Sequence, residues 1–142
     1  MENEILYILK KGFNMIHVYY RGSCTSSRKA FVWFKKYGIK IEKKKLSKLS
    51  KHELLELLTS SDEGISYIIK RPGKNRLYIS KVLEEMMDMT LNEALDYLLS
   101  NSDLLPTPII MDGKNFLIGY NENEIRKFLP KELRRFRIEK LI

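Results

Sequence analysis

The sequence contains a single cysteine, Cys24, so no disulfide can form within the chain. Chains without internal disulfides are typical of reducing compartments, and we expect a cytoplasmic protein. No apolar run reaches the roughly 18 residues that a membrane-spanning helix requires. Residues 1–14 lack the long apolar core and the small-residue cleavage site of a secretory signal.

Motifs for metals and phosphate-bearing cofactors are also missing. The chain has 2 histidines, His17 and His52, and neither has a second His or Cys at ligand spacing. Its 7 glycines form neither G-x-x-x-x-G-K nor G-x-G-x-x-G, the loops that cradle phosphate groups. The sequence therefore predicts no metal site and no cofactor.

Positive charge and apolar side chains are abundant instead. The net charge is +8 and the pI is near 9.5, which predicts an acidic partner such as nucleic acid, an anionic surface or an acidic protein. A hydrophobic fraction of 44% with 11% aromatic residues is typical of a folded chain. A length of 142 residues suits one domain.

The first part of the chain predicts a βαβ unit. Residues 16–20 (IHVYY) are typical of a strand and end in an Arg-Gly-Ser turn. Residues 26–37 place aromatic and small side chains at helical spacing, and Gly38 ends that helix. Residues 39–45 favour a second strand, which would pair parallel to the first through a right-handed crossover.

The middle of the chain favours helices. Residues 50–53 form a capping box that begins a leucine-rich helix through residue 58. A short helix is predicted at 65–69, and Pro and Gly make 71–75 a loop. A second capping box begins a helix over about 90–99.

The last part predicts a hairpin and a helix. Apolar residues 109–111 and 116–118 flank an Asp-Gly-Lys-Asn turn, as in two antiparallel strands. Residues 121–124 begin a third helix, which Pro130 follows.

The element order β-α-β, helices, β-β-α is that of an α/β, thioredoxin-like domain with a helical insertion between its halves. We expect a single domain over residues 15–142, with the insertion at about 50–100 and a basic tail at about 131–142. Residues 1–14 form an N-terminal extension to which the sequence assigns no role.

Cys24 lies where the first strand gives way to the first helix. A thiol at a helix N-terminus is near unpaired N–H groups, and Arg21, Arg28 and Lys29 add positive charge. These features favour a reactive thiolate, whereas the alternative is a buried and inert cysteine. Ser27 stands where a C-x-x-C protein has its second thiol, so no local disulfide can form. Oxidation to a sulfenic acid or capping by a small thiol remains open.

Three stretches together resemble the Spx regulators of the arsenate-reductase-like (ArsC-like) family. They are CTSSRK at 24–29, PII at 108–110 and GYNENEIRKFLP at 119–130. The resemblance runs over about residues 15–136, and the third stretch separates Spx proteins from true arsenate reductases. It implies a non-enzymatic, monomeric global transcriptional regulator of stress responses that binds the C-terminal domain of the RNA polymerase α subunit. It also implies control by proteolysis, with a protease adaptor as a further partner.

The resemblance implies where the polymerase would bind. In the family this contact centres on a glycine after an acidic pair, a pattern matched by Asp62, Glu63 and Gly64. A glycine lets another backbone approach closely. The alternative is that Gly64 only makes a turn.

The resemblance also implies a redox switch, from which this sequence departs twice. Ser27 replaces the second switch cysteine, and Thr107 replaces the arginine that precedes the proline of the third strand. Threonine has neither the charge nor the bidentate fork of arginine. The Thr107–Pro108 bond is expected to be cis, as in thioredoxin folds. We therefore expect a degenerate switch site at Cys24, Ser27, Arg28, Thr107 and Pro108, and a regulator largely independent of redox state.

An arsenate-reductase-like thiol oxidoreductase is the alternative function, because C-x-x-S-R also occurs in enzymes of this family that use one cysteine. Such an enzyme needs several arginines around Cys24 to neutralise an oxyanion. Arg28 and Arg71 are available, but Thr107 and residues 118–119 stand where the enzymes have further arginines.

Direct contact with promoter DNA is a third possibility. The basic tail offers Lys131, Arg134, Arg135 and Arg137. Residues 43–45 add a second lysine cluster. Charge of this kind suits phosphate contacts, although a solvated basic face is the simpler interpretation. We expect weak, salt-sensitive contact that strengthens only in complex with the polymerase domain.

Overall fold

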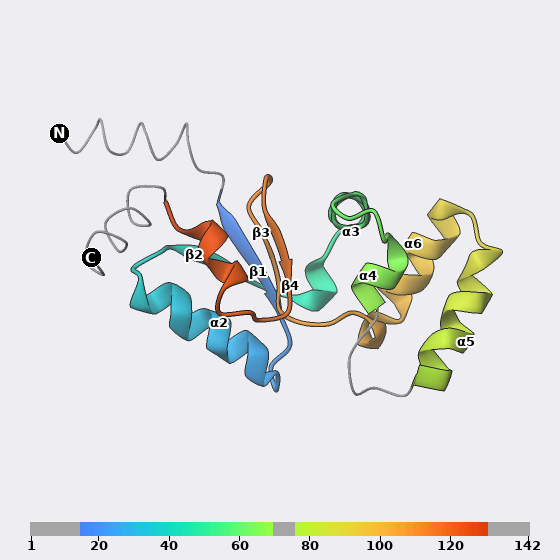
Figure 1. The fold of residues 1–142 in the computed structure, drawn as a ribbon, viewed down its shortest axis with the longest axis horizontal. Coiled ribbons are helices and arrows are strands. Elements are labelled where there is room, and N and C mark those ends of the chain that lie inside the picture. The colour runs from blue at the N-terminus through green and yellow to red at the C-terminus, as the bar shows by residue number, and fades with distance from the viewer. Residues whose placement is uncertain (1–14, 70–75, 131–142) are drawn as a thin grey trace.

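The computed structural model describes residues 15–69 and 76–130. In this part of the chain, a four-stranded sheet has the order β2-β1-β3-β4 (Figure 1). Its strands are β1 (Ile16–Tyr20), β2 (Ile41–Lys45), β3 (Ile109–Met111) and β4 (Phe116–Ile118). The helices are α2 (Thr25–Lys36), α3 (Lys51–Thr59), α4 (Ile65–Ile69), α5 (Arg76–Met87) and α6 (Leu91–Ser100). Three short 3-10 helices complete it: η1 (Leu46–Lys48), η2 (Ser102–Leu104) and η3 (Glu124–Phe128).

The strands pair as the βαβ and hairpin predictions require. β1 runs parallel to β2, with Ile16 opposite Ile41. β3 joins the other side of β1 in antiparallel fashion and pairs in turn with β4, also antiparallel. The α/β, thioredoxin-like fold class predicted from the sequence is confirmed.

The sheet separates two hydrophobic cores, because alternate residues of a strand face opposite sides. Val18, Ile110 and Leu117 face α2 and η3, where they pack against Phe34 and Phe128. The neighbouring positions on the strands face the insertion. There, Tyr19, Ile109 and Met111 pack with leucines and isoleucines of α3, α4 and α6.

The helices α3 to α6 form one body on the far side of the sheet from α2 (Figure 1). Its two capping boxes are formed as predicted: Ser50 caps α3 with Glu53, and Thr90 caps α6 with Glu93. Tyr19 on β1 donates a hydrogen bond to the Glu53 carboxylate. Glu53 thus joins the insertion to the sheet as well as capping α3.

The structure contains two short 3-10 helices that were not predicted, η1 and η2, and it differs from the predicted elements at three further places. β2 begins at Ile41 rather than residue 39, because the Ile39 N–H donates to the Phe34 carbonyl and closes the end of α2 (2.9 Å). The segment after Asn121 is a 3-10 helix, which sets Ile125 and Phe128, three residues apart, on one buried side.

The third difference is α5, which the predictions omitted. Its partly or fully buried residues recur at helical spacing, and they are Ile79, Val82, Leu83 and Met86. The loop predicted at 71–75, the N-terminal extension 1–14 and the basic tail lie outside the described residues. No helix of the described residues has the length and apolar character needed to cross a membrane.

Candidate functional site

Cys24 is the N-cap of α2. Its sulfur accepts a hydrogen bond from the Ser27 N–H (3.4 Å), and its thiol donates to the Thr107 carbonyl (3.4 Å). The sequence produces this arrangement because Gly22 and Ser23 turn the chain sharply out of β1, and Cys24 has the extended backbone that a helix cap requires. Cys24 is half-buried, so small reagents can reach it.

The pKa of the Cys24 thiol lies below its ordinary value. Burial opposes ionisation, but the side chains of Ser27 and Thr107 and the backbone N–H groups of Ser27 and Ser26 outweigh it. The shift has the direction predicted for a thiol at a helix N-terminus. Its causes are these polar groups, whereas the neighbouring basic side chains, which were also predicted to contribute, are not among them.

The basic side chains near Cys24 in the sequence point to solvent or bond to the backbone. Arg28 and Lys29 lie on the exposed face of α2. The Arg21 guanidinium donates to the carbonyl oxygens of Leu105 (2.7 Å) and Ser102, so it braces the segment that leads to Thr107. Its donors serve the fold and not a bound oxyanion.

Ser27 and Thr107 complete the surroundings of the thiol. Ser27 is 1% exposed, and its hydroxyl lies close enough to Cys24 to favour the thiolate, although it makes no hydrogen bond of standard geometry. Thr107 is 8% exposed and the Thr107–Pro108 peptide bond is cis, as predicted. The Gly119 N–H donates to the Pro108 carbonyl (2.7 Å), which ties the start of the GYNENEIRKFLP segment to this site. We call Cys24, Ser27, Thr107 and Pro108 the thiol site.

A second candidate site is the turn between α3 and α4. Asp62 and Glu63 are exposed, and Gly64 has the left-handed φ of 60° that favours glycine. A Cβ built on Gly64 would meet no other atom within 4 Å, so the space above it is open. We call Asp62, Glu63 and Gly64 the D-E-G turn.

Acidic groups continue beyond the D-E-G turn. Tyr67, in the first turn of α4, is 36% exposed. Burial and the nearby carboxylates of Glu124 and Glu63 raise the pKa of its hydroxyl. Glu124 comes from the start of η3, whose backbone is held by Asn121: the Asn121 Oδ1 accepts from the N–H groups of Asn123 (2.9 Å) and Glu124 (3.0 Å). Tyr67 is close to the D-E-G turn in sequence, and its N–H donates to the Gly64 carbonyl (3.1 Å), whereas only the tertiary fold brings Glu124 toward this turn.

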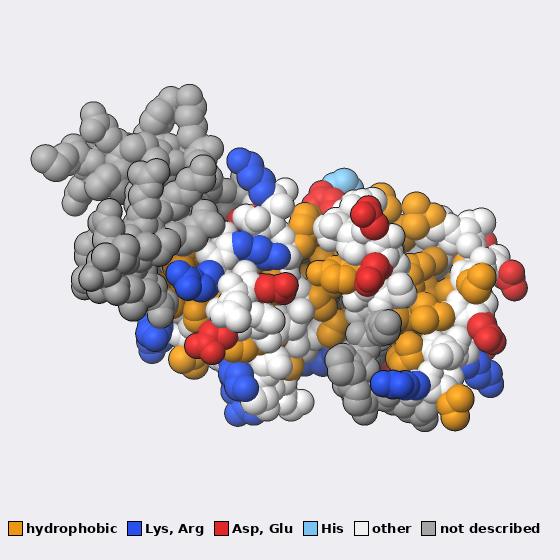
Figure 2. Space-filling model, viewed as in Figure 1, with side chains coloured by type: hydrophobic (Ala, Val, Ile, Leu, Met, Phe, Trp, Pro, Cys, Tyr) orange, Lys and Arg blue, Asp and Glu red, His pale blue; other side chains and the backbone are white. Residues whose placement is uncertain are grey.

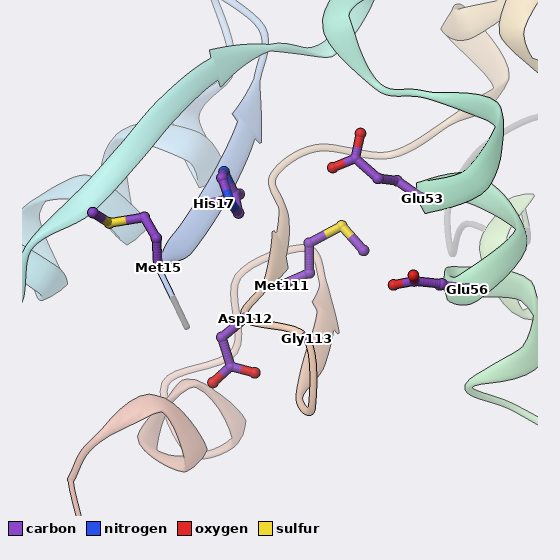
Figure 3. Close-up of a pocket in the computed structure, with 7 residues that line it drawn as sticks. All are labelled: Met15, His17, Glu53, Glu56, Met111, Asp112 and Gly113. Carbon is purple, nitrogen blue, oxygen red and sulfur yellow. The ribbon is translucent and has the colours of Figure 1, made fainter. Parts of the chain in front are cut away.

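A shallow hollow of about 350 Å³ lies between the sheet and α3 (Figure 3). Two of its carboxylates already serve the fold. Glu53 bonds to Tyr19 and caps α3, and the Asp112 carboxylate accepts from backbone N–H groups of the β3–β4 turn. Figure 3 shows Asp112 turned away from the two glutamates of α3. The described residues contain no group of three His, Cys, Asp or Glu side chains arranged for a metal ion.

Of the two basic clusters predicted to contact DNA, only the lysines of residues 43–45 lie within the described residues. Lys43 and Lys45 are exposed on β2, an edge strand, while Lys44 is half-buried. Lys131, Arg134, Arg135 and Arg137 lie outside the described residues, as does Arg71 of the enzymatic alternative.

Comparison with known proteins identifies the family to which this chain belongs. The profile of the ArsC family matches residues 19–128. A global transcriptional regulator Spx from Streptococcus agalactiae is 35% identical over 123 residues, which cover 85% of this chain and 88% of the relative. The chain belongs to the Spx group of the ArsC family. Another relative, global transcriptional regulator Spx 2 from Oceanobacillus iheyensis, is 38% identical over 117 residues, or 81% of this chain and 84% of the relative.

Solved structures agree on the fold of this ArsC-family chain. An arsenate reductase from Vibrio cholerae superposes with a TM-score of 0.63 at 16% identity, covering 82% of this chain and 99% of that one. A putative arsenate reductase from Yersinia pestis gives a TM-score of 0.61 at 22% identity, covering 80% and 99%. At these identities the likeness establishes the thioredoxin-like fold alone. The sequence relatives named Spx favour a regulator over an enzyme.

Proposed function

We propose that this Spx-group protein is a global transcriptional regulator that binds the C-terminal domain of the RNA polymerase α subunit through the D-E-G turn, without an intramolecular disulfide switch. The observation that carries the proposal is the open space above Gly64, whose left-handed backbone lies between an exposed acidic pair and α4. Any side chain at this position would project into that space, so glycine leaves room for a partner's backbone.

The charge around the D-E-G turn supports this proposal. The chain as a whole carries +8, yet Asp62, Glu63 and the nearby Glu124 make this surface locally acidic. Tyr67 adds a half-exposed phenol, a side chain that is common at binding hot spots. A partner with basic side chains around a small apolar contact would fit this surface.

The thiol site supports the proposal that the protein has no intramolecular disulfide switch. Ser27 is buried directly beside the Cys24 sulfur and has no thiol, so oxidation cannot close a disulfide across the first turn of α2. Thr107 is buried and brings no positive charge to the sulfur. We therefore propose a docking protein that works in reduced and oxidised cells alike, with promoter DNA contacted only in the complex.

Arsenate-reductase-like chemistry is the second candidate, favoured by the lowered pKa of Cys24. Oxyanion binding needs several converging cations. Among the described residues, Arg21 is committed to backbone carbonyls and Arg28 is on the exposed face of α2. Incubation with arsenate, glutathione and glutaredoxin tests this candidate, and arsenite formation that Cys24→Ser abolishes would establish it.

Calorimetric titration of the full chain with the isolated α C-terminal domain tests the proposed function. The sharpest variant is Gly64→Asn, because asparagine tolerates a left-handed φ and so adds a side chain with little strain. Gly38→Asn is the matched control, since Gly38 has φ 66° and equally open space at the end of α2. We expect about tenfold weaker binding for Gly64→Asn and less than about twofold change for Gly38→Asn. Equal binding by both variants, or no binding by the wild type, would contradict the proposal.

A further inference from the structure

The outer face of α2 is strongly basic. Residues on this face recur at helical spacing, and its four cations are Arg28, Lys29, Lys35 and Lys36. The helix contains no acidic residue, and none of the four forms an ion pair with another described residue. At the centre of the stripe, Val32 is 68% exposed. In Figure 2 the basic side chains over α2 occupy the lower left of the molecule.

An apolar groove of about 330 Å³ lies beside this stripe, between α2 and β2. Phe31, Val32, Ile39 and Ile41 contribute to its apolar lining, and Lys35 and Lys43 supply its charge. The Lys43 Nζ is 4.4 Å from the centroid of the Phe31 ring, and Phe31 also packs edge-on against Tyr20 (5.3 Å). These contacts hold the lining in place. We call this feature the α2–β2 groove.

The combination of charge and apolar lining identifies the kind of partner. A nucleic-acid backbone would use the lysines but would gain nothing from covering Val32 and the isoleucines. An acidic amphipathic segment of a protein would use both, because its carboxylates can pair with Lys35 and Lys43 while an apolar side chain enters the groove.

A simpler explanation exists for the lysines alone. Lysine on an edge strand such as β2 prevents pairing with other chains. That explanation covers Lys43 and Lys45, but it does not account for cations along α2 or for a highly exposed valine between them.

We propose that the α2–β2 groove binds an acidic amphipathic segment of a second protein, with one apolar side chain of that segment seated between α2 and β2. The groove and the D-E-G turn lie on different elements, the groove beside α2 and the turn between α3 and α4 (Figure 1). This proposal therefore does not depend on the proposed polymerase contact.

Fluorescence anisotropy with a labelled synthetic helical peptide tests this proposal. The peptide has glutamates flanking one central leucine, and a second peptide replaces that leucine by serine. We expect saturable binding of the first peptide to the full chain and about fivefold or greater weakening for the serine peptide. The double variant Lys35→Glu/Lys43→Glu should weaken the leucine peptide by about tenfold or more.

Two controls keep the outcome interpretable. Lys48→Glu/Lys81→Glu changes the net charge equally at exposed positions outside the groove, and its binding should stay within about twofold of wild type. A charge-swapped peptide, with lysines in place of the glutamates, should bind Lys35→Glu/Lys43→Glu better than wild type. That rescue would also show that the variant is folded.

Three outcomes would overturn the proposal. They are no binding of the leucine peptide, equal loss in the Lys48→Glu/Lys81→Glu control, and binding that ignores the leucine while duplex DNA competes fully. The last outcome would make the groove a surface for polyanions.

Discussion

The thiol site and the D-E-G turn are both candidate sites, yet they differ in how much of their surface a partner could contact. At the thiol site the sulfur already has a donor and an acceptor, and Ser27 and Thr107 are buried around it. At the D-E-G turn the acidic pair is exposed and the space above Gly64 is open. A helix-capping geometry suited to thiol chemistry thus occurs here without the second thiol of a C-x-x-C switch and without a cation at the sulfur. The proposed function therefore uses the open surface of the D-E-G turn.

Substitutions at the two sites should differ most in their effect on binding of the polymerase α domain. Gly64→Arg places a long cation on the acidic, open surface and should weaken binding of the polymerase α domain by about 100-fold or more. Cys24→Ala removes the sulfur from a site that we assign no role in docking, so binding should change by less than about twofold. Calorimetric titration measures both. Comparable losses in the two variants would mean that the sites act together.

Replacing Ser27 by cysteine should restore the ability of the thiol site to form a disulfide. Ser27→Cys places a thiol one helical turn from Cys24, where the Ser27 N–H already contacts the Cys24 sulfur. We expect mild oxidation to convert both thiols to a disulfide that dithiothreitol reverses. Thiol titration and mass spectrometry of the oxidised protein would check this. If two free thiols persist after oxidation, the geometry of the thiol site is not that of a switch.

The third prediction concerns the joint between the sheet and the insertion that carries the D-E-G turn. Glu53→Gln weakens the hydrogen bonds that the Glu53 carboxylate accepts from the Tyr19 hydroxyl and from the Ser50 N–H at the cap of α3, and should destabilise the fold by about 1 kcal/mol. Denaturant unfolding measures this change. Glu93→Gln is the matched control, because it alters only the exposed cap of α6 and should cost about half as much.

The stability from Glu53 should also depend on pH. Burial alone would raise the pKa of Glu53, but hydrogen bonds from Tyr19 and Ser50 outweigh it and lower that pKa. A carboxylate whose pKa is lower in the folded state stabilises fully above its unfolded pKa, about 4.3. This contribution is lost as the pH falls through the folded pKa. The stability difference between wild type and Glu53→Gln should therefore shrink in acid, and a difference that grows in acid would contradict the assignment.

The smallest expected effect lies within the thiol site. Ser27→Ala removes one of the groups that lower the pKa of Cys24, so the pH midpoint of Cys24 alkylation should rise by less than about one unit. Iodoacetamide labelling across the pH range measures the midpoint. Thr107→Ser retains the hydroxyl and should leave the midpoint nearly unchanged.

Much of the fold was predictable from local signals. The capping boxes at Ser50 and Thr90, and the Asp-Gly turn of the hairpin, are short-range patterns that the structure reproduces. α5 was missed although its apolar spacing is helical, and the segment after Asn121 became a 3-10 helix because burial of Ile125 and Phe128 decides its geometry.

The candidate sites were predictable from the sequence only where local features define them. The position of Cys24 at the start of a helix follows from sequence order, and so does its lowered pKa. The contribution of Thr107 comes from 83 residues away and requires the tertiary fold. The α2–β2 groove likewise depends on two elements packing side by side, which periodicity along one helix does not reveal.

The proposed function requires that docking to the polymerase does not depend on the redox state of the thiol site. The most direct measurement is the affinity of the full chain for the α C-terminal domain in excess dithiothreitol and after treatment with diamide. We expect equal dissociation constants within about twofold, and loss of binding under both conditions in Gly64→Arg. Binding that appears or disappears on oxidation of the wild type would be incompatible with the proposed function and would make Cys24 a one-thiol sensor.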